Sequence, residues 1–283
     1  MEDIVVDLRD WPYAVLNLLG DLHFENIATD EDATENAKSK ILSEAFSRVI
    51  GMGDYVDCII SGDPRFDLST RANKYPKPAD MENKVEEYWA PLASITDCAL
   101  FGNHELTVMK KYGNFLWHVC KRLKMRYGGW SAIITYKMKH GDFRIYVTHS
   151  KGSHSSKVRD PIRRDAALRD YIRAKTVDKA YNCQAYCIAH IHRLRGFREY
   201  KELKMITKDG KTSFIEEITE PFLGVTGQFM RGYDSVGIIQ KDGTIEPVTS
   251  YVEIGGYKPQ PVGFLQIIID DKGDILGHNE VVL

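Results

Sequence analysis

The sequence lacks the features of a membrane-spanning, secreted or disulfide-stabilised protein. No apolar run approaches the ~18 residues that a membrane helix needs. The chain begins Met1-Glu2-Asp3, with two acids where a secretion signal carries basic residues. Its five cysteines are odd in number and scattered, which is typical of buried thiols. We therefore expect a soluble, cytoplasmic protein that does not contact a membrane, and the sequence leaves its oligomeric state open.

Strong charge bias, internal repeats and low-complexity tracts are also missing. The formal net charge of −2 excludes a global basic field, so any phosphate-binding surface must be local. Hydrophobic residues make up 43% and charged residues 28%, which excludes a disordered or fibrous chain. A length of 283 residues fits one large domain or two small ones. No Pro/Gly/Ser-rich linker separates the halves, so we predict a single domain over residues 1–283.

Buried-strand patterns and helical periodicities alternate along the first two thirds of the chain, which predicts an α/β fold. Continuous apolar runs predict buried strands at Val15–Leu19, Cys98–Phe101, Ser131–Tyr136, Phe143–Thr148 and Ala185–Ala189. Helical spacing predicts helices at Asn36–Ile50, Met81–Ile95, Leu106–Lys124 and Pro161–Lys175. After residue 193, turn signals at 208–211, 241–244 and 271–274 predict an antiparallel meander.

Five short segments stand where a predicted buried strand emerges into a loop, which is where α/β sheets build ligand sites. They are Gly20–His23, Gly53–Asp57, Gly102–Glu105, Thr148–Ser150 and Ala189–His192. Asp21 and His23 are two residues apart, as are His190 and His192, so in extended backbone each pair points to one face. Carboxylate plus imidazole suits divalent Mn, Fe, Zn or Ni.

Each segment by itself has an ordinary structural explanation. An Asp after Gly is commonly a turn residue or helix cap, and a single His beside a strand is commonly a satisfied polar residue. Five of the nine histidines nevertheless lie in these segments, together with two Gly-Asp steps. Unrelated turn residues and helix caps would not be expected to occur together with so many histidines at strand ends. The ordered set therefore favours a metal site.

In this order the segments resemble the calcineurin-like metallophosphoesterase superfamily: Asp-x-His, Gly-Asp, Gly-Asn-His-Glu, a lone His, and Ala-His-x-His. The resemblance covers residues 20–192. It implies a four-layer αββα sandwich of two mixed β-sheets flanked by helices, with the metal site at the strand ends. It also implies a hydrolase that holds two divalent metal ions, with Mn favoured over Fe, Zn, Ni or Mg.

The resemblance assigns roles by position. It places Asp21, His23 and His192 on the first metal. Asn103, His149 and His190 fall on the second metal, Asp54 bridges both, and His104 lies beside them as the catalytic histidine. Ala189 stands where the family has Gly and Glu105 where many members have Asp. We interpret Asp57 as structural, either an N-cap or an acceptor behind a ligand.

The implied chemistry is in-line attack of a metal-bridging hydroxide on a phosphate ester. Two divalent metals outweigh two carboxylates and one hydroxide, so the site keeps a positive charge that attracts phosphate. His104, as imidazolium, protonates the leaving oxygen or stabilises the transition state.

The substrate is less determined. We favour phosphodiesters, of a nucleotide or a nucleic acid, over a phosphomonoester or a phosphoprotein. The Arg-Gly that follows Gly-Asp-x-x-Asp in related protein phosphatases is replaced by Cys58-Ile59. A non-catalytic scaffold on the same fold is disfavoured because every expected position is filled.

Two segments are candidates for substrate binding. The segment from Lys151 to Lys179 contains nine basic residues and four aspartates. Arg159 and Arg163 are its candidates for binding substrate phosphates. A solvated helix face with Arg–Asp pairs at helical spacing explains the same pattern. The second segment, 226–233, offers Arg231 for phosphate and Tyr233 for stacking. An ordinary turn with a core Phe229 explains it equally well.

Overall fold

The computed structural model describes residues 1–59, 77–152, 154, 160–198, 201–208, 211–218, 221–233, 236–239, 244–248, 253 and 258–283. The helices are α1 (Glu31–Ser43), α2 (Pro78–Trp89), the 3₁₀ helix η2 (Ala90–Ile95), α3 (Asn103–Tyr112), α4 (Phe115–Leu123) and α5 (Pro161–Thr176). The first strands are β1 (Glu2–Asp7), β2 (Tyr13–Leu19), β3 (Ser47–Gly51), β4 (Thr96–Leu100), β5 (Tyr127–Gly129), β6 (Ser131–Lys137), β7 (Asp142–Thr148) and β8 (Ala185–Ile188). The later strands are β9 (Leu194–Phe197), β10 (Lys201–Lys208), β11 (Lys211–Ile218), β12 (Phe222–Gln228), β13 (Val236–Ile239), β14 (Ile245–Val248), β15 (Gly263–Asp270) and β16 (Ile275–Val282).

One mixed sheet carries the structure. Its strands run in the order β1-β6-β7-β8-β12-β15-β2-β3-β4-β5, with β9 and β16 paired to β12 and β15. Among the described strands, backbone pairing joins the two halves where β12 pairs with β15, through Gly227↔Phe264 and Gln228↔Gly263. The α/β class is thereby confirmed. The expected two separate sheets of a four-layer sandwich are not found as such, because this junction makes the halves one sheet.

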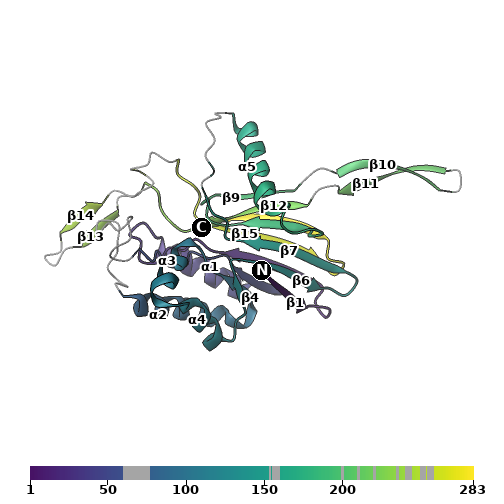
Figure 1. Cartoon of the computed structure of the whole chain (residues 1–283). Coiled ribbons are helices and arrows are strands. Elements are labelled where there is room, and N and C mark those ends of the chain that lie inside the picture. Colours follow the sequence, from purple (N-terminus) through teal and green to yellow (C-terminus); the bar gives the residue numbers. More distant parts are fainter. Residues whose placement is uncertain are drawn as a thin grey trace.

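Three apolar clusters hold the sheet and helices together. The first lies between the two halves and joins Leu16 and Ile50 to Ile134 and Val147. The second packs α1, α2 and α4 against the β2–β3–β4 half, and the third packs α5 against β8 and β12. Figure 1 shows α5 on one side of the strands and α1, α2 and α4 on the other. Side chains buried on both faces explain why these strands read as continuous apolar runs.

Polar caps set where several helices begin. Asp30 caps α1 by accepting from the Ala33 N–H, and Asn114 caps α4 in the same way. Asp160 caps α5, and Pro161 supplies the fixed φ that suits the first helical position. The predicted start of α5 is therefore correct, and its end at Thr176 lies one residue beyond the prediction.

Two predicted helices are wrong in extent. The helix expected over Asn36–Ile50 ends at Ser43, and its last apolar residues belong to β3, which pairs with β2 and β4. Tertiary pairing overrides the helical spacing there. The helix expected over Leu106–Lys124 is two helices, because Gly113 adopts φ 90° and ends α3.

The carboxyl third forms the predicted hairpins but not a simple meander. β10 pairs with β11, β13 with β14 and β15 with β16, one hairpin at each turn signal. Between them, β12 and β15 enter the central sheet beside β8 and β2. Strands from the end of the chain thus complete the sheet that begins at its start. The spacing of turns says nothing about such distant pairing.

The structure also bears on the predictions made from the cysteines and from the lack of long apolar runs. All five cysteines are buried and free, as predicted. Among the described helices, none has the length and apolar character needed to cross a membrane.

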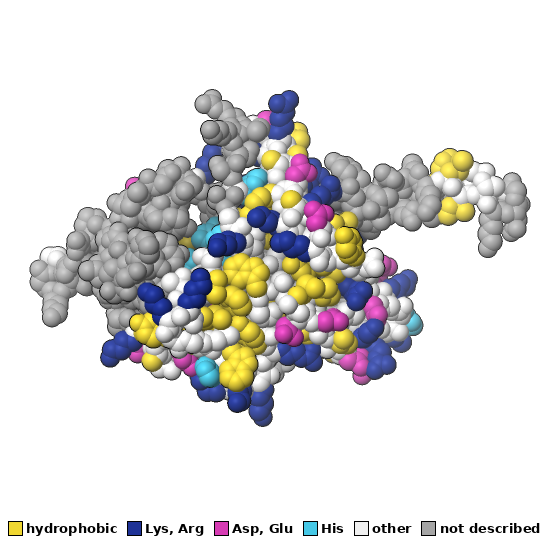
Figure 2. All heavy atoms as spheres, viewed as in Figure 1, with side chains coloured by type: hydrophobic (Ala, Val, Ile, Leu, Met, Phe, Trp, Pro, Cys, Tyr) yellow, Lys and Arg dark blue, Asp and Glu magenta, His cyan; other side chains and the backbone are white. Residues whose placement is uncertain are grey.

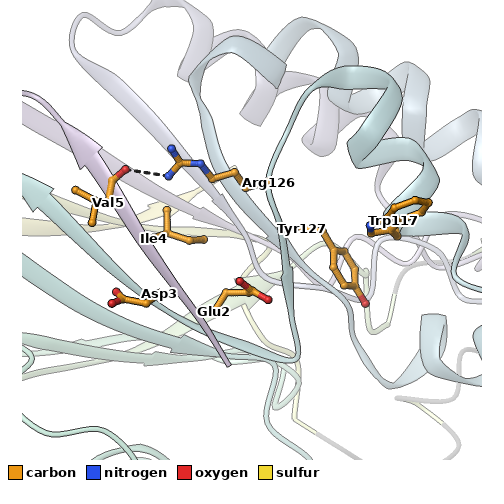
Figure 3. Close-up of a pocket in the computed structure, with 7 residues that line it drawn as sticks. All are labelled: Glu2, Asp3, Ile4, Val5, Trp117, Arg126 and Tyr127. Atoms are coloured by element: carbon orange, nitrogen blue, oxygen red, sulfur yellow. Dashed lines mark hydrogen bonds between the residues drawn. The ribbon is translucent and has the colours of Figure 1, made fainter.

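A hollow of about 580 Å³ separates the two outer strands of the sheet. There the Arg126 guanidinium, at the start of β5, donates to the Val5 carbonyl of β1 over 2.9 Å (Figure 3). Trp117 lies at its rim with 44% of its surface exposed. This hollow contains none of the strand-end residues singled out from the sequence.

The two tryptophans Trp89 and Trp117 provide a test of the core. Trp89 is fully buried, with its ring 5.2 Å from that of Tyr55 between centroids. We expect Trp89→Ala to lower the free energy of unfolding by about 3–5 kcal/mol. Trp117→Ala should cost less than about 1 kcal/mol because much of its ring is already in water. Urea unfolding measures both, and equal costs would contradict the assignment of this core.

Candidate active site

The first group of predicted ligands converges where β2 and β8 end. The Nε2 atoms of His23 and His192 are 3.1 Å apart. Asp21 Oδ1 lies 3.6 Å from the His192 Nε2 and 3.9 Å from the His23 Nε2. One carboxylate oxygen and two imidazole nitrogens thus face a common point, which is the donor set of a divalent metal.

The second group converges around Asp54, which follows β3. Asp54 Oδ2 lies 3.0 Å from the His149 Nε2 and 4.0 Å from the His190 Nδ1. Asn103 Oδ1, at the start of α3, is 3.1 Å from the same His149 Nε2. The two groups adjoin, because Asp54 Oδ2 is also 3.9 Å from the His23 Nε2. Asp54 therefore lies between the groups, where the sequence predicts a bridging ligand.

The two carboxylates are held in the same way. Asp21 Oδ2 accepts the His190 backbone N–H over 2.9 Å, and Asp54 Oδ1 accepts the His104 backbone N–H over 2.9 Å. The remaining oxygens, Asp21 Oδ1 and Asp54 Oδ2, are buried and lack a hydrogen-bond partner among the described residues. Buried carboxylate oxygens without a donor are costly unless a cation neutralises them. These orphan oxygens therefore fit bound metal ions.

The hydrogen bonds of the imidazoles point to the same conclusion. His149 Nδ1 lies 2.7 Å from the Met52 carbonyl, which can only accept, so this nitrogen carries the proton. His23 Nδ1 likewise lies 3.2 Å from an oxygen of Asp57. Both rings consequently turn Nε2 toward the carboxylates, and in the neutral ring this nitrogen carries a lone pair. A bound cation that replaces the Nε2 proton would be shared by this lone pair and the carboxylate oxygen.

Electrostatics at the metal-free site are dominated by these carboxylates. Burial opposes a charged His149, but the Asp54 and Asp21 carboxylates outweigh it and raise the pKa of His149 to about 9. Burial also opposes ionised Asp54, yet His149 and His104 hold the pKa of Asp54 well below its usual range. Burial lowers the pKa of His23 and favours its neutral form. The site thus stabilises positive charge at its centre.

The backbone route to this geometry differs from the one expected. The sequence predicts that extended backbone points both side chains of each Asp-x-His and His-x-His pair to one face. Instead the ligands adopt positive φ: Asp21 at 51°, His23 at 52°, Asp54 at 51°, His190 at 81° and His192 at 50°. Residues other than glycine pay a conformational cost in this region, and such residues cluster at functional sites. The side chains converge because the loops turn sharply, not because the strands continue.

Glycine is required where these loops touch. A Cβ on Gly53 would lie 2.7 Å from the Gly102 nitrogen and 2.8 Å from the His149 Nδ1. On Gly102, a Cβ would collide with the Asp54 carboxylate. The missing Cβ atoms therefore allow the loops to approach closely at these two positions.

Glu105 has a role that the sequence did not reveal. Its fully buried carboxylate accepts backbone N–H groups from Gly102 (2.8 Å), Asp54 (2.9 Å), Tyr55 (2.7 Å) and Val56 (3.2 Å). It therefore ties the Asp54 loop to the start of α3. Burial and the nearby Asp54 raise the pKa of Glu105 to about 7. A capping-box spacing was the only signal for it, since Glu105 also lies at position N3 of α3.

Asp57 supports two histidines. Besides the bond to His23, its carboxylate lies 3.3 Å from the His104 Nδ1, and its backbone carbonyl makes a closer contact with the same nitrogen. Asn26 donates to the other carboxylate oxygen over 3.2 Å. Of the two expected roles, the acceptor behind a ligand is the one found.

His104 stands beside the first group, with its ring centroid 4.7 Å from that of His23. Its Nδ1 contacts Asp57, so Nε2 is the ring nitrogen turned away from that carboxylate. The site opens on this side and around the last segment, since the side chains of His104, His190 and His192 are 13%, 23% and 22% exposed. Figure 2 shows histidine side chains reaching the surface below α5, with Lys and Arg side chains nearby.

Comparison with known proteins agrees with this geometry. The family model for calcineurin-like phosphoesterases matches residues 16–194. The chain belongs to this family. Membership indicates a hydrolase that acts on phosphate esters and binds divalent metals, in keeping with the candidate metal clusters.

The similar solved structures share little sequence with the chain. A metallophosphoesterase from Sphaerobacter thermophilus is 13% identical, covers 87% of this chain and 95% of its own, and has a TM-score of 0.37. GAP50, the anchor in the inner membrane complex of Plasmodium, is 10% identical, covers 96% of this chain and 89% of its own, and has a TM-score of 0.35. No curated protein matches the chain.

The candidate substrate residues of this calcineurin-like phosphoesterase are less concentrated than its ligands. Arg163 is exposed on the first turn of α5, and Arg159 lies outside the described residues. Arg231 pairs with Asp30 over 2.6 Å, and Tyr233 is 45% exposed. Phe229 is fully buried and donates its N–H to the Asp21 carbonyl over 3.1 Å. The segment 226–233 thus packs beside the Asp21 loop with Phe229 in the core.

Charge pairing on α5 also differs from the expected helical spacing. Asp165, expected to pair with Arg169, contacts Arg195 of β9 over 2.9 Å. Arg169 lies over the Phe197 ring, with 5.6 Å from its guanidinium carbon to the ring centroid. These contacts join α5 to β9. They were hidden because β9 is distant from α5 in sequence.

Asp57 offers a test of ligand positioning. We expect Asp57→Asn to weaken divalent-metal affinity by about 10–100-fold, because the amide holds His23 less well in the required tautomer. Asp7→Asn removes an exposed carboxylate that pairs with the neighbouring Arg9 and should leave affinity unchanged. Isothermal titration with Mn²⁺ measures both. Equal affinity of Asp57→Asn and wild type would refute the role of Asp57.

Proposed function

We propose that this calcineurin-like phosphoesterase is a dinuclear metal-dependent enzyme that hydrolyses phosphodiesters of a nucleotide or nucleic acid. The observation that carries the proposal is the pair of orphan oxygens, Asp21 Oδ1 and Asp54 Oδ2. Each faces imidazole nitrogens, and Asp54 is shared between the two groups. A single cation cannot satisfy both sets equally, so two are proposed.

The donor sets suggest the ligands of each ion. Asp21, His23 and His192 would hold the first, Asn103, His149 and His190 the second, and Asp54 would bridge them. Mixed carboxylate, amide and imidazole donors favour Mn, with Fe, Zn, Ni or Mg as alternatives. When bound, two such ions would supply a hydroxide nucleophile and neutralise the phosphoryl oxygens.

The chain's own residues supply the rest of the proposed reaction. His104, with Nδ1 held by Asp57, presents Nε2 at the open side of the site. From there it would donate a proton to the leaving oxygen or stabilise negative charge on the transition state. Glu105 keeps Asp54 and the start of α3 in register without touching the substrate.

The remaining expectations join the proposal. We propose one domain over residues 1–283, since β12 and β15 complete the sheet that carries the ligands. A cytoplasmic location and a phosphate-ester substrate are proposed on the sequence arguments above. A catalytically silent scaffold is disfavoured, because all seven ligands and His104 are brought together.

Asp54→Asn tests the bridge. The amide keeps the shape of the side chain but removes the negative charge shared by the two ion sites. We expect hydrolysis of a chromogenic phosphodiester with Mn²⁺ to fall to background, while Asp7→Asn stays at the wild-type rate. Substantial turnover in Asp54→Asn would overturn the dinuclear proposal. Running the matched monoester beside the diester decides between phosphodiesterase and phosphomonoesterase.

His104→Ala separates catalysis from metal binding. General acid–base groups contribute about 10²–10⁴-fold, so we expect kcat to fall in that range. Metal content, measured by elemental analysis after gel filtration, should stay at the wild-type value because His104 is proposed not to ligate. Loss of metal together with activity would make His104 a ligand instead.

A further inference from the structure

Two arginines, one of them directly after the proposed ligand His192, lie close enough to repel each other. Arg193 directly follows the ligand His192, and it is half-buried. Its backbone carbonyl accepts the Gly227 N–H over 2.8 Å, which fixes the chain immediately after the ligand. Arg164 is also half-buried and lies on α5. The contacts of Asp165 with Arg195 and of Arg169 with Phe197 hold this part of α5 along the segment that starts at Arg193.

A histidine approaches the same place from a third element. His154 follows the ligand His149 by five residues, and its ring centroid lies 5.1 Å from that of Tyr171 on α5. The Tyr171 hydroxyl donates to the Gly152 carbonyl over 3.1 Å, so the loop after β7 is anchored to the helix. The Nε2 of His154 is buried and has no hydrogen-bond partner among the described residues. Burial and the neighbouring Arg193 both lower the pKa of His154.

The positive charges in this place are not balanced. Within the part of the chain that the structure describes, neither Arg164 nor Arg193 forms an ion pair. The nearby carboxylate of Asp165 is engaged by Arg195, which also reaches Glu280 at 3.5 Å. Arg164 and Arg193 are close enough to repel each other, and the Asp165 carboxylate offsets part of that repulsion. Like charges that are half-buried and unpaired are unfavourable alone and become favourable when an anion binds between them.

From this arrangement we propose that Arg164, Arg193 and His154 form an anion subsite beside the metal centre, which binds a second phosphate of the substrate. Arg193 and His154 come from the segments that carry His192 and His149, and Arg164 comes from α5, which contacts both segments, so the subsite and the reacting phosphate share one opening. Guanidinium groups suit phosphate because they donate two parallel hydrogen bonds. The inference rests on the proposed phosphodiesterase function and narrows its substrate to a nucleic-acid strand, in which a further phosphate adjoins the one cleaved.

A matched pair of chromogenic substrates tests the subsite. The p-nitrophenyl ester of thymidine 5′-phosphate has one phosphate, and the same ester with an added 3′-phosphate has two. We expect Arg164→Gln/Arg193→Gln to raise KM for the two-phosphate ester by about 10-fold or more. For the one-phosphate ester, KM and kcat should stay near wild type. Arg122→Gln removes the same charge from α4, where Arg122 pairs with Glu82 and Glu86, and should change neither substrate's KM.

Equal KM effects on both esters, or none on either, would overturn the subsite. A dinucleotide in place of the 3′-phosphate ester distinguishes an internal backbone phosphate from a terminal one. If KM rises for the terminal phosphate but not for the dinucleotide, the nucleic-acid assignment is wrong and a nucleoside bisphosphate is the substrate class.

A binding measurement separates this inference from the proposed function. Fluorescence anisotropy of a labelled pentanucleotide with metal-free protein needs no turnover. The double variant should bind more weakly than wild type and Arg122→Gln, with a log–log salt slope shallower by roughly 1. If wild type hydrolyses neither ester but this difference is present, the catalytic proposal fails and the subsite stands. No difference in affinity or slope would overturn the subsite whatever the activity.

Discussion

The structure depends on two buried carboxylates that the protein itself leaves half satisfied. Asp21 and Asp54 each bind one backbone N–H, from His190 and His104 respectively, and each points a second oxygen at imidazole nitrogens. Two like charges buried this close are unfavourable in a medium of low polarity. Cations resolve the conflict, and the tautomers set by Met52 and Asp57 leave lone pairs ready to share them. The arrangement therefore favours the binding of cations.

The surrounding backbone fixes the loops that carry the two carboxylates. Loops after β2, β3 and β4 are tied together by hydrogen bonds from Asp21 to Gly53, from His23 to Asp54, and through the Glu105 carboxylate. These bonds offset the cost of positive φ at the ligands. Gly53 and Gly102 let the loops come into contact where any side chain would collide. Strain at the ligands is thus balanced by a rigid frame at the strand ends.

The frame also places positive charge around the opening. β9 returns along α5, so Arg193 and Arg164 adjoin the ligands without adding to them. The proposed subsite would let a near-neutral chain bind a polyanion locally, since the field at the site would arise from a few half-buried groups rather than from net charge.

The candidate site residues at the strand ends were predictable because they lie in short motifs of neighbouring residues. Gly-Asp, Gly-Asn-His and His-x-His after apolar runs indicate a metal site in any chain in which strands precede them, and their order indicates the family. The helix start at Asp160-Pro161 and the hairpin at 271–274 were local signals of the same kind. The extent of α1 was not, because Val49 and Ile50 fit a helix in sequence and a strand only once β2 and β4 flank them.

The sequence by itself therefore determined the α/β class and the family, and it predicts the ligand set, since each follows from residue types at short spacing. Only the tertiary structure decided that the proposed ligands converge through positive φ, that Glu105 joins two loops, and that Arg193 and Arg164 lie close enough to repel each other. It also decided that β12 and β15 unite the halves into one sheet. These features depend on residues far apart in the chain, and their contacts arise from packing that no local pattern encodes.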